Sequence, residues 1–406
     1  MLDLFELDQY NLFSPQAIAN PYPIYARLRS EDPVHLDETL GCWVVTRYAD
    51  VVAALSNRSL SSERISAERL RGKQWQELRP LFHLVSKQML LSDPPAHTRM
   101  RALVSKAFTP RAINVMRAHI QQIVDGLISA LLPMGRMDGI QDFAYPLPTI
   151  VIAEMLGIPQ EEREQFKCWT TDLANFLGNP LTLAQSQQAF RSVQALQSSF
   201  HTIIEQRRKC PQDDLITALV LAEEKGDVLS EDELFSNCMG LFTAGHETTT
   251  NLIGNGLLAL LHHPDQLQRL RDEPGLITTA IEELLRFDSP IQYTARLVKK
   301  EVEIGGKHIR EGEGIMLMLG AANRDPAQFP EPDRLIIGRR ENRHLAFGHN
   351  IHFCIGAALA RLEAHIAFET LLSRLPSISL ETEALEWQGN LAFHGLKSLP
   401  VAFAGV

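Results

Sequence analysis

Cys354 lies in the stretch HLAFGHNIHFCIGAALARLE, between a glycine-containing loop and an alanine-rich segment that predicts a helix. A thiol at the start of a helix is unusually acidic, because exposed backbone N–H groups and the helix dipole stabilise the thiolate. The residues around Cys354 therefore allow three roles for this side chain: a nucleophile, a metal ligand, or a small buried apolar group.

The remaining cysteines narrow the kind of site that Cys354 can belong to. Cys42, Cys168, Cys210 and Cys238 are widely scattered, no CxxC pair occurs, and the total of five is odd. This pattern suits a reducing cytoplasm and argues against a disulfide framework. It also excludes a four-cysteine zinc or iron–sulfur motif, so a metal at Cys354 would need a scaffold of its own.

Two other short patterns contain residues that could bind ions. In AIEELLRF, Glu283 and Arg286 stand at i and i+3, on one face of a predicted helix. In DPPAHTRMRALVSKAFTP, His97 and Arg101 stand one helical turn apart, as two donors that grip an anion would. Taken singly, each pair is equally typical of a solvated helix face.

The longest predicted helix runs from about 231 to 262. Ser230 and Glu233 form a capping box at its start, and Pro264 ends it. Its middle, TAGHETTT, contains Gly245 and four threonines. A glycine costs about 1 kcal/mol there and each threonine several tenths. Such breaches are common at functional sites, but a glycine-mediated helix crossing, with threonines bonded back to the preceding turn, would give the same pattern.

Hydrophobic periodicity predicts a mainly α-helical chain with small β-sheets. Residues 42–48 and 295–319 predict strands, the latter broken by turns at Gly305-Gly306 and Gly312. Amphipathic spacing predicts further helices at 115–132, 187–208, 265–273 and 277–287. With no linker and no repeat, we expect residues 1–406 to form a single unit.

Composition excludes some partners. The net charge of −10 argues against a general nucleic-acid binder. No window has the roughly 18 consecutive apolar residues of a membrane span, and the N-terminal stretch lacks a signal-peptide pattern. One segment before Cys354 is locally basic and contains Arg334, Arg339, Arg340 and Arg343. This segment is either a solvated face with one arginine in a structural ion pair or a docking patch for an acidic partner.

Taken together, these patterns resemble the cytochrome P450 family of the soluble bacterial type, over nearly the whole chain. The cysteine loop F-G-x-N-x-H-x-C-x-G, the Glu283–Arg286 pair, the AGHET segment and the His97–Arg101 pair occur in that family's order and at its distances. The closest resemblance is to members that tailor polyketides or oxidise fatty acyl chains, on the stretches TAGHETTTNLIGN, ANRDP and HLAFGHNIHFCIGAALARLEAHIAF. It implies a single P450 haem domain over 1–406, with helix 231–262 crossing the haem.

The resemblance also assigns roles in binding haem b. Cys354 would be the axial thiolate ligand of the iron. Phe347 would shield the sulfur, and Gly348 would let the loop turn tightly. The haem propionates would be bound by four cationic or N–H-donating side chains: His97, Arg101, Arg296 and His352.

A buried triad of Glu283, Arg286 and Arg339 would fix the backbone of the cysteine loop, with the adjacent Arg340 as the alternative third member. The chain departs from the family at Asn350, where glycine is usual. Asparagine tolerates a positive φ better than other non-glycine residues. We therefore expect the loop to close, and any consequence to fall on haem affinity or redox potential.

The middle of the long helix would serve the reaction. Gly245 would leave room for dioxygen, Thr248 would hold a water, and Glu247 would pass protons inward from solvent. A relay of hydroxyl, carboxylate and water suits a reaction that needs two protons. Thr249 and Thr250 are expected to be structural.

The resemblance implies a monooxygenase that inserts one oxygen atom from O2 into a C–H bond or alkene of a large apolar substrate. A polyketide or macrolide intermediate is favoured, free or tethered to a carrier protein, with a fatty acid or terpenoid as the alternative. A peroxide-driven hydroxylase is disfavoured, because such members usually lack the acid–alcohol pair of Glu247 and Thr248. The alternative of another class is a haem-thiolate binding or sensor protein without turnover, in which that pair would have no purpose.

Electrons would have to come from another protein, because no G-x-G-x-x-G fingerprint or flavin domain is present. A ferredoxin or flavodoxin with its reductase is expected to dock near Arg339, Arg340, Arg343 and the segment around Arg111. The protein is expected to be a cytoplasmic monomer. The substrate would contact mainly apolar side chains: Leu84, Val85, Phe176, Leu177, Leu241, Ile291, Phe393 and Leu396.

Overall fold

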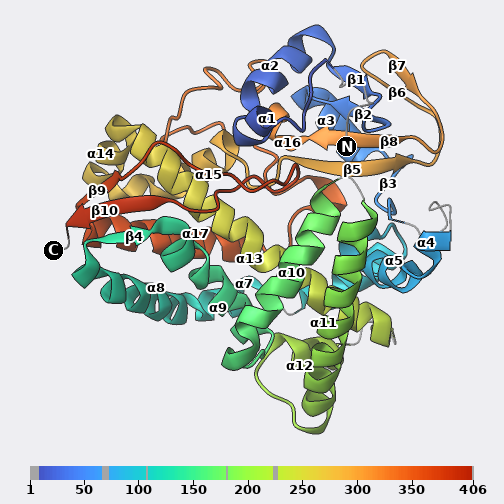
Figure 1. Cartoon of the computed structure of the whole chain (residues 1–406), viewed down its shortest axis with the longest axis horizontal. Helices are drawn as coiled ribbons and strands as arrows, with labels where there is room; N and C mark the ends of the chain where they lie inside the picture. Colours follow the sequence, from blue (N-terminus) through green and yellow to red (C-terminus); the bar gives the residue numbers. More distant parts are fainter. Residues whose placement is uncertain (1–8, 66–72, 107, 180–181, 223–226, 405–406) are drawn as a thin grey trace. The chain divides into compact units, whose positions relative to one another are not determined.

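The computed structural model describes residues 9–65, 73–106, 108–179, 182–222 and 227–404 (Figure 1). The chain is mainly α-helical with small β-sheets, as the sequence predicts. Its internal contacts divide it into two compact units. Unit 1 contains residues 1–60, 118–147 and 248–406, and unit 2 contains residues 61–117 and 148–247. The single-domain organisation expected over 1–406 stays a prediction.

Unit 1 contains the sheets. Four strands lie in the order β1-β2-β8-β5, with β2 parallel to β8 and the other pairs antiparallel: β1 (Val34–Asp37), β2 (Cys42–Val45), β8 (Gly314–Met318) and β5 (Tyr293–Val298). A second sheet has the order β4-β10-β9: β4 (Arg136–Asp138), β10 (Pro400–Ala404) and β9 (Ser377–Leu380). Strands β6 (Val302–Ile304) and β7 (Lys307–Ile309) form a hairpin, and β3 (Leu60–Ser61) crosses the boundary between the units.

The strand predictions were partly wrong in their limits. The strand predicted at 42–48 ends at Val45, and Tyr48 already begins a helix. The backbone N–H of Tyr48 donates to Asp325 Oδ2 at 2.8 Å, and this contact caps the helix where a strand was expected to continue. The turns predicted at Gly305-Gly306 and Gly312 are confirmed, because all three glycines have positive φ, the backbone conformation that such turns require.

The helices of unit 1 alternate with these strands along the chain. They are α1 (Pro15–Ala19), α2 (Tyr22–Glu31), α3 (Tyr48–Ser56), α8 (Arg117–Leu131), α14 (Pro264–Asp272), α15 (Ile277–Phe287), α16 (Leu319–Ala322) and α17 (Ala357–Arg374). Single turns of 3-10 or π helix complete them: η3 (Leu132–Met134), η4 (Gly139–Ala144), η6 (Pro274–Leu276) and η7 (Asn350–His352). Helix α15 has the limits that its periodicity predicts. Helix α8 begins two residues later than predicted, because a turn at Met116 separates it from α7.

The regular elements of the described part of unit 2 are helices, apart from its share of β3. Its helices are α4 (Lys73–Gln76), α5 (Arg79–Ser86), α6 (Ala96–Ser105), α7 (Pro110–Val115), α9 (Pro146–Met155), α10 (Arg163–Gly178), α11 (Leu183–Lys209) and α12 (Leu215–Val220), with the 3-10 turns η2 (Met89–Leu91) and η5 (Gln160–Glu162). Helices α8 and α9 each begin just before a boundary between the units. The helix predicted at 187–208 is the larger part of α11.

Helix α13 (Glu231–His262) continues through both units and has the limits predicted for the longest helix. The capping box is confirmed: the Ser230 N–H donates to Glu233 Oε2 at 2.9 Å, and the Glu233 N–H donates to Ser230 Oγ at 3.3 Å. The two hydrogen bonds satisfy N–H groups that the first turn leaves unpaired. Within the described ranges, none of the helices combines the length and apolar character that a bilayer crossing needs.

A glycine brings α13 close to the elements on which the predicted site residues lie. A Cβ at Gly256 would stand 2.7 Å from Phe368 Cζ on α17 and 3.1 Å from Leu284 Cδ1 on α15. Phe368 is fully buried, so its ring has little room to shift. Helices α15 and α17 therefore pack against α13 at a distance that only glycine allows.

We expect Gly256→Val to lower the free energy of unfolding by about 1–3 kcal/mol, because the added methyls overpack a filled core. Urea denaturation measures this change. Gly126→Val is the matched control, since Gly126 is an exposed mid-helix glycine and a Cβ there would meet nothing within 4 Å. The control should change stability by no more than about 0.5 kcal/mol. Equal effects of the two substitutions would contradict the packing argument.

Candidate functional site

Cys354 lies between η7 and α17, and its side chain is exposed. Its backbone N–H donates to the carbonyl of Phe347 at 2.9 Å, which closes the loop. A Cβ at Gly356, the residue before α17, would stand 3.9 Å from Cys354 Sγ, so the sulfur lies beside the first turn of the helix. The start of an 18-residue helix favours the thiolate form of such a side chain.

Two residues of the loop have the left-handed backbone conformation. Gly348 has φ 71° and Asn350 has φ 58°. The expectation that asparagine can occupy this position with a positive φ is therefore confirmed. Asn350 also begins η7, whose last residue is His352.

The structure brings Glu283, Arg286 and Arg339 into one buried cluster. Arg286 donates to both carboxylate oxygens of Glu283, at 2.8 and 2.9 Å, and Arg339 Nε donates to Oε2 at 3.0 Å. Glu283 and Arg286 have no exposed surface, and Arg339 is 9% exposed. Arg340, the alternative third member, is exposed.

This cluster also binds backbone. The Ile336 N–H donates to Glu283 Oε1 at 2.9 Å. The two guanidinium groups donate to carbonyls of the chain before the cysteine loop: those of Asn323, Pro330 and Pro332. The Asn323 side chain accepts the N–H of Leu345 at 2.7 Å, two residues before Phe347. One carboxylate thus fixes two cations that in turn hold the segment leading to Cys354.

A second carboxylate, Glu282, was missed by the sequence reasoning. Arg361 donates to its two oxygens at 2.6 and 2.8 Å, and His344 Nε2 lies 3.1 Å from Oε2. Burial opposes ionisation of Glu282, but the hydrogen bonds from Arg361 and His344 outweigh it and lower its pKa to about 2. A signal was present in the sequence, because Arg361 is a cation only seven residues after Cys354.

The predicted haem-binding residues Arg296 and His352 lie in the same unit as Cys354. Arg296 is on β5, 6% exposed, and its Nη1 donates to Thr294 Oγ1 at 3.1 Å and to the Ala295 carbonyl at 2.8 Å. His352 is half-buried at the end of η7.

The other predicted pair, His97 and Arg101, lies in unit 2, one turn apart on α6. His97 is 2% exposed. Burial lowers the pKa of His97, and the positive charge of Arg101 lowers it further. The imidazole is therefore neutral at pH 7 and can offer an N–H donor beside a cationic guanidinium.

The middle of α13 has structural reasons for some of its unusual residues. A Cβ at Gly245 would stand 2.8 Å from Ile152 Cγ1 on α9, and Thr243 Oγ1 donates to the Met239 carbonyl at 2.9 Å. The alternative of a glycine-mediated crossing with back-bonded threonine is thus found at these two positions. Ala244 is nevertheless exposed in mid-helix, and Glu247 and Thr248 are half-buried.

A buried histidine adjoins Glu247. His246 Nδ1 lies 2.9 Å from the Phe242 carbonyl, and Nε2 lies 3.6 Å from Glu247 Oε2. Burial lowers the pKa of His246, while the charge of Glu247 opposes this effect. The acid predicted to move protons therefore has a second titratable group beside it.

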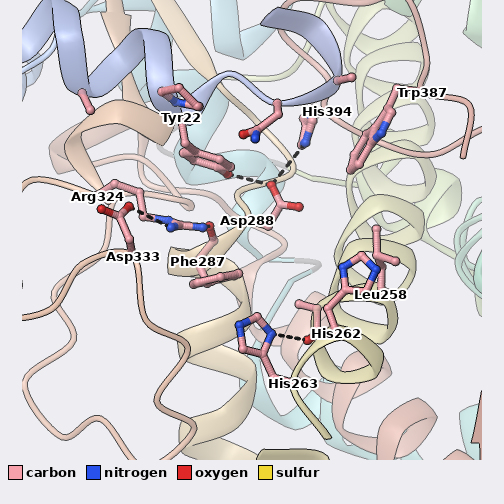
Figure 2. A pocket seen from close by; sticks show the side chains of 15 residues that line it. Tyr22, Leu258, His262, His263, Phe287, Asp288, Arg324, Asp333, Trp387 and His394 are labelled. Atoms are coloured by element: carbon pink, nitrogen blue, oxygen red, sulfur yellow. Dashed lines mark hydrogen bonds and ion pairs between the residues drawn. The ribbon is translucent and has the colours of Figure 1, made fainter. Parts of the chain in front are cut away.

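Unit 1 also contains a cavity of about 500 Å³ that holds none of the predicted site residues (Figure 2). Its polar groups bind each other. Tyr22 donates to Asp288 Oδ1 at 2.6 Å, His394 Nε2 lies 3.3 Å from the same oxygen, and Arg324 is paired with Asp333 at 3.0 Å. These contacts hold α2, the end of α15 and the loop residues Asp333 and His394 together.

The residues of the cysteine loop suit a haem iron. An exposed thiol at a helix start offers one thiolate ligand, Phe347 lies next to it in the loop, and Arg296 offers a cation in the same unit. The chemistry of this donor set matches thiolate ligation with carboxylate-binding cations.

The chain matches the family model described as Cytochrome P450 over residues 73–384. The polyketide biosynthesis cytochrome P450 PksS of Bacillus subtilis (strain 168) is 41% identical over 395 residues, which cover 95% of this chain and 96% of the relative. The cytochrome P450 monooxygenase PikC of Streptomyces venezuelae is 41% identical over 396 residues, which cover 94% of this chain and 91% of the relative.

The solved structures include a similar chain in a complex. P450BioI, in a crystal structure with hexadec-9Z-enoic acid ligated acyl carrier protein, superposes with a TM-score of 0.90 at 38% identity. The alignment covers 96% of this chain and 99% of that chain. The fold expected from the sequence is therefore confirmed.

We expect Glu283→Ala to destabilise the protein by about 3–5 kcal/mol, because two buried cations lose their carboxylate. Urea unfolding measures this loss, and we expect the purified variant to contain no haem. Glu273→Ala is the control, since its ion pair with Arg269 is exposed and should contribute at most about 1 kcal/mol. A Glu283→Ala protein with the wild-type haem content would contradict the assignment.

Proposed function

Because the chain belongs to the cytochrome P450 family and is a monooxygenase of that family, we propose that it binds haem b through Cys354 and oxidises a large apolar biosynthetic intermediate. The observation that carries this proposal is the exposed Cys354 thiol at the start of α17, in a loop closed by Phe347. When bound through a thiolate, haem supplies the activation of dioxygen, because electron donation from sulfur favours O–O cleavage.

Four side chains would bind the haem carboxylates through N–H groups. Arg296 would contribute a guanidinium and His352 a ring N–H, and His97 and Arg101 would contribute from α6. Glu283, Arg286 and Arg339 would not touch the cofactor. They would hold the backbone that carries Phe347 and Cys354, and the buried ion pairs among them support this role.

Glu247 and Thr248 would deliver protons. They are consecutive on α13 and both half-buried, so each can reach water and the interior. The Thr248 hydroxyl would hold a water in hydrogen-bond reach of the reacting oxygen, and Glu247 would exchange protons with solvent. Gly245 would leave space for dioxygen, next to its contact with Ile152.

A polyketide or macrolide intermediate is the proposed substrate. PksS, named for polyketide biosynthesis, supports this class. The residues expected to contact the substrate differ in how far they are buried. Half-buried side chains can contact a ligand directly, and these are Leu177, Leu241, Ile291 and Phe393. The others are buried: Leu84, Val85, Phe176 and Leu396.

A fatty acyl chain is the second candidate, and the P450BioI complex favours it. That protein holds a fatty acid attached to acyl carrier protein. A carrier-tethered substrate would suit either class, because polyketide intermediates are also built on carriers. Terpenoid hydroxylation has no specific observation in its favour.

A ferredoxin or flavodoxin with its reductase is the proposed electron donor. Arg340 and Arg343 are exposed beside the cysteine loop, as are the apolar side chains of Ile351 and Phe353. The Arg339 guanidinium is buried against Glu283, so the proposed docking near this segment relies on Arg340 and Arg343. The Arg111 side chain lies outside the described residues.

The first test is the absorption spectrum of the dithionite-reduced protein with carbon monoxide, for wild type and Cys354→Ser. We expect a strongly red-shifted Soret band in wild type that the substitution removes, because only thiolate ligation produces it. Cys238→Ser is the control, since that thiol is fully buried on α13. A wild-type band typical of histidine ligation, or no haem, would refute the proposed function.

The second test separates a catalyst from a haem-binding sensor. With the compound that most shifts the iron spin state among polyketide, fatty acyl and carrier-bound ligands, wild type should couple reductant consumption to product. We expect Thr248→Ala to consume reductant and release hydrogen peroxide, with product per electron falling at least about tenfold.

Thr250→Ala is the control for that test, because Thr250 Oγ1 is buried and makes no hydrogen bond within the described residues. It should leave coupling near the wild-type value. Equal coupling in Thr248→Ala and wild type would remove the threonine from the reaction, and no turnover with any ligand would favour the sensor.

A further inference from the structure

A cation lies over the aromatic ring of the cysteine loop. The Arg361 guanidinium carbon is 4.4 Å from the centroid of the Phe347 ring. At this distance the guanidinium charge is attracted by the ring face. The two oxygens of Glu282 hold the guanidinium in a fork, at 2.6 and 2.8 Å, so its plane and position are fixed.

His344 completes this arrangement from the other end of the loop. Its Nδ1 accepts the backbone N–H of Ala346 at 3.2 Å, which leaves the proton on Nε2, 3.1 Å from Glu282 Oε2. The imidazole centroid is 6.0 Å from that of Phe347. Glu282 therefore holds both a cation and an imidazole that contact the same ring.

The ring is joined to the sulfur through the backbone. The Phe347 carbonyl accepts the Cys354 N–H, and Phe353 lies beside the ring with its centroid 6.2 Å away. Arg361 stands on α17, whose start faces Cys354. A displacement of Arg361 would thus move the Phe347 ring, which is proposed to shield the thiolate, and would change the net charge near the Cys354 sulfur.

We propose that Glu282 and Arg361 are positioning residues for the Cys354 centre: their ion pair fixes the Phe347 ring and balances the charge beside the thiolate, and so sets the electron affinity of haem bound there. This inference rests on the proposed function. It assigns separate duties to two adjacent carboxylates of α15, since Glu283 holds backbone and Glu282 holds the ring.

The arrangement differs from an ordinary surface ion pair. Exposed pairs contribute little, because water screens them and the side chains lose freedom. The Glu282 side chain is 25% exposed and bound by three donor atoms, and the low pKa of its carboxyl, about 2, agrees with tight binding of the anion. The Arg361 side chain is 37% exposed, with one face against a ring.

If the charges of Glu282 and Arg361 act on the haem in this way, removing one or the other should shift the reduction potential of the haem in opposite directions. Glu282→Gln leaves the Arg361 charge uncompensated, which favours the reduced haem and raises the potential. Arg361→Met leaves the Glu282 charge uncompensated, which lowers it. Each change should alter the reduction equilibrium constant on the order of tenfold, as expected for a unit charge near the iron in a medium of intermediate dielectric.

The experiment is a spectroelectrochemical titration of the holoproteins. Arg374→Met is the matched control, because Arg374 lies on the same helix and pairs with Asp125 at 3.6 Å, away from the loop. Arg361→Lys keeps the charge but loses the fork, so it should keep the potential near wild type while weakening the reduced carbon monoxide band, as a less shielded sulfur is more readily protonated.

Opposite shifts, with Arg374→Met unchanged, support the proposal. Shifts of the same sign, or no larger than that of Arg374→Met, overturn it. If Glu282→Gln loses its haem, the charge role is tested with Glu282 intact: a lower potential in Arg361→Met beside an unchanged one in Arg361→Lys supports the proposal, and equal shifts of the two overturn it. The wild-type carbon monoxide band is recorded first, so its absence refutes the proposed function, whereas unchanged potentials beside a normal band refute this inference alone.

An independent readout needs no haem. The pKa of Glu282 is lowered in the folded state, so the pair contributes stability that is present above the unfolded value of about 4.3 and lost as pH falls toward 2. Urea unfolding between pH 5 and 3 should show wild type approaching Glu282→Gln as the pH falls. A constant difference across that window would show that the carboxylate is not held by the pair.

Discussion

The buried carboxylate of Glu283 is the interaction on which the rest of the site depends. It neutralises two buried guanidinium groups, and these donate to backbone carbonyls of a segment that has little regular structure. A charge removed from water must find its partners inside the protein, because an unpaired one costs several kcal/mol. The segment from Asn323 to Arg339 therefore has one favourable arrangement, and the cysteine loop begins where it ends.

Helix α15 directs two consecutive acids to different duties. Successive residues on an α-helix point about 100° apart, so Glu282 and Glu283 face different surroundings. Glu283 is completely buried, whereas Glu282 reaches the partly exposed surface where His344 and Arg361 bind it. The same short helix thus holds both the backbone before the loop and the aromatic ring within it.

The middle of α13 combines packing with exposure. Gly245 admits Ile152, and Thr243 bonds to the turn above, yet Ala244 is exposed and the two predicted proton-transfer residues are half-buried. Weak helix formers are tolerated there because the capping box and the packing of Gly256 fix the two ends of the helix in place. A residue pattern that lowers local helix stability can persist where long flanking segments supply the stability.

The sequence by itself determined the elements and the local chemistry. The periodicity of α15, the capping box of α13 and the positive φ at Asn350 depend on near neighbours, so they could be predicted. Only the tertiary structure decided that Arg339 rather than Arg340 binds Glu283, and that Glu282, His344 and Arg361 meet at Phe347. These contacts are between residues that lie dozens of positions apart in the sequence. They depend on which side chains are buried and on where those side chains point, and a local sequence pattern does not contain that information.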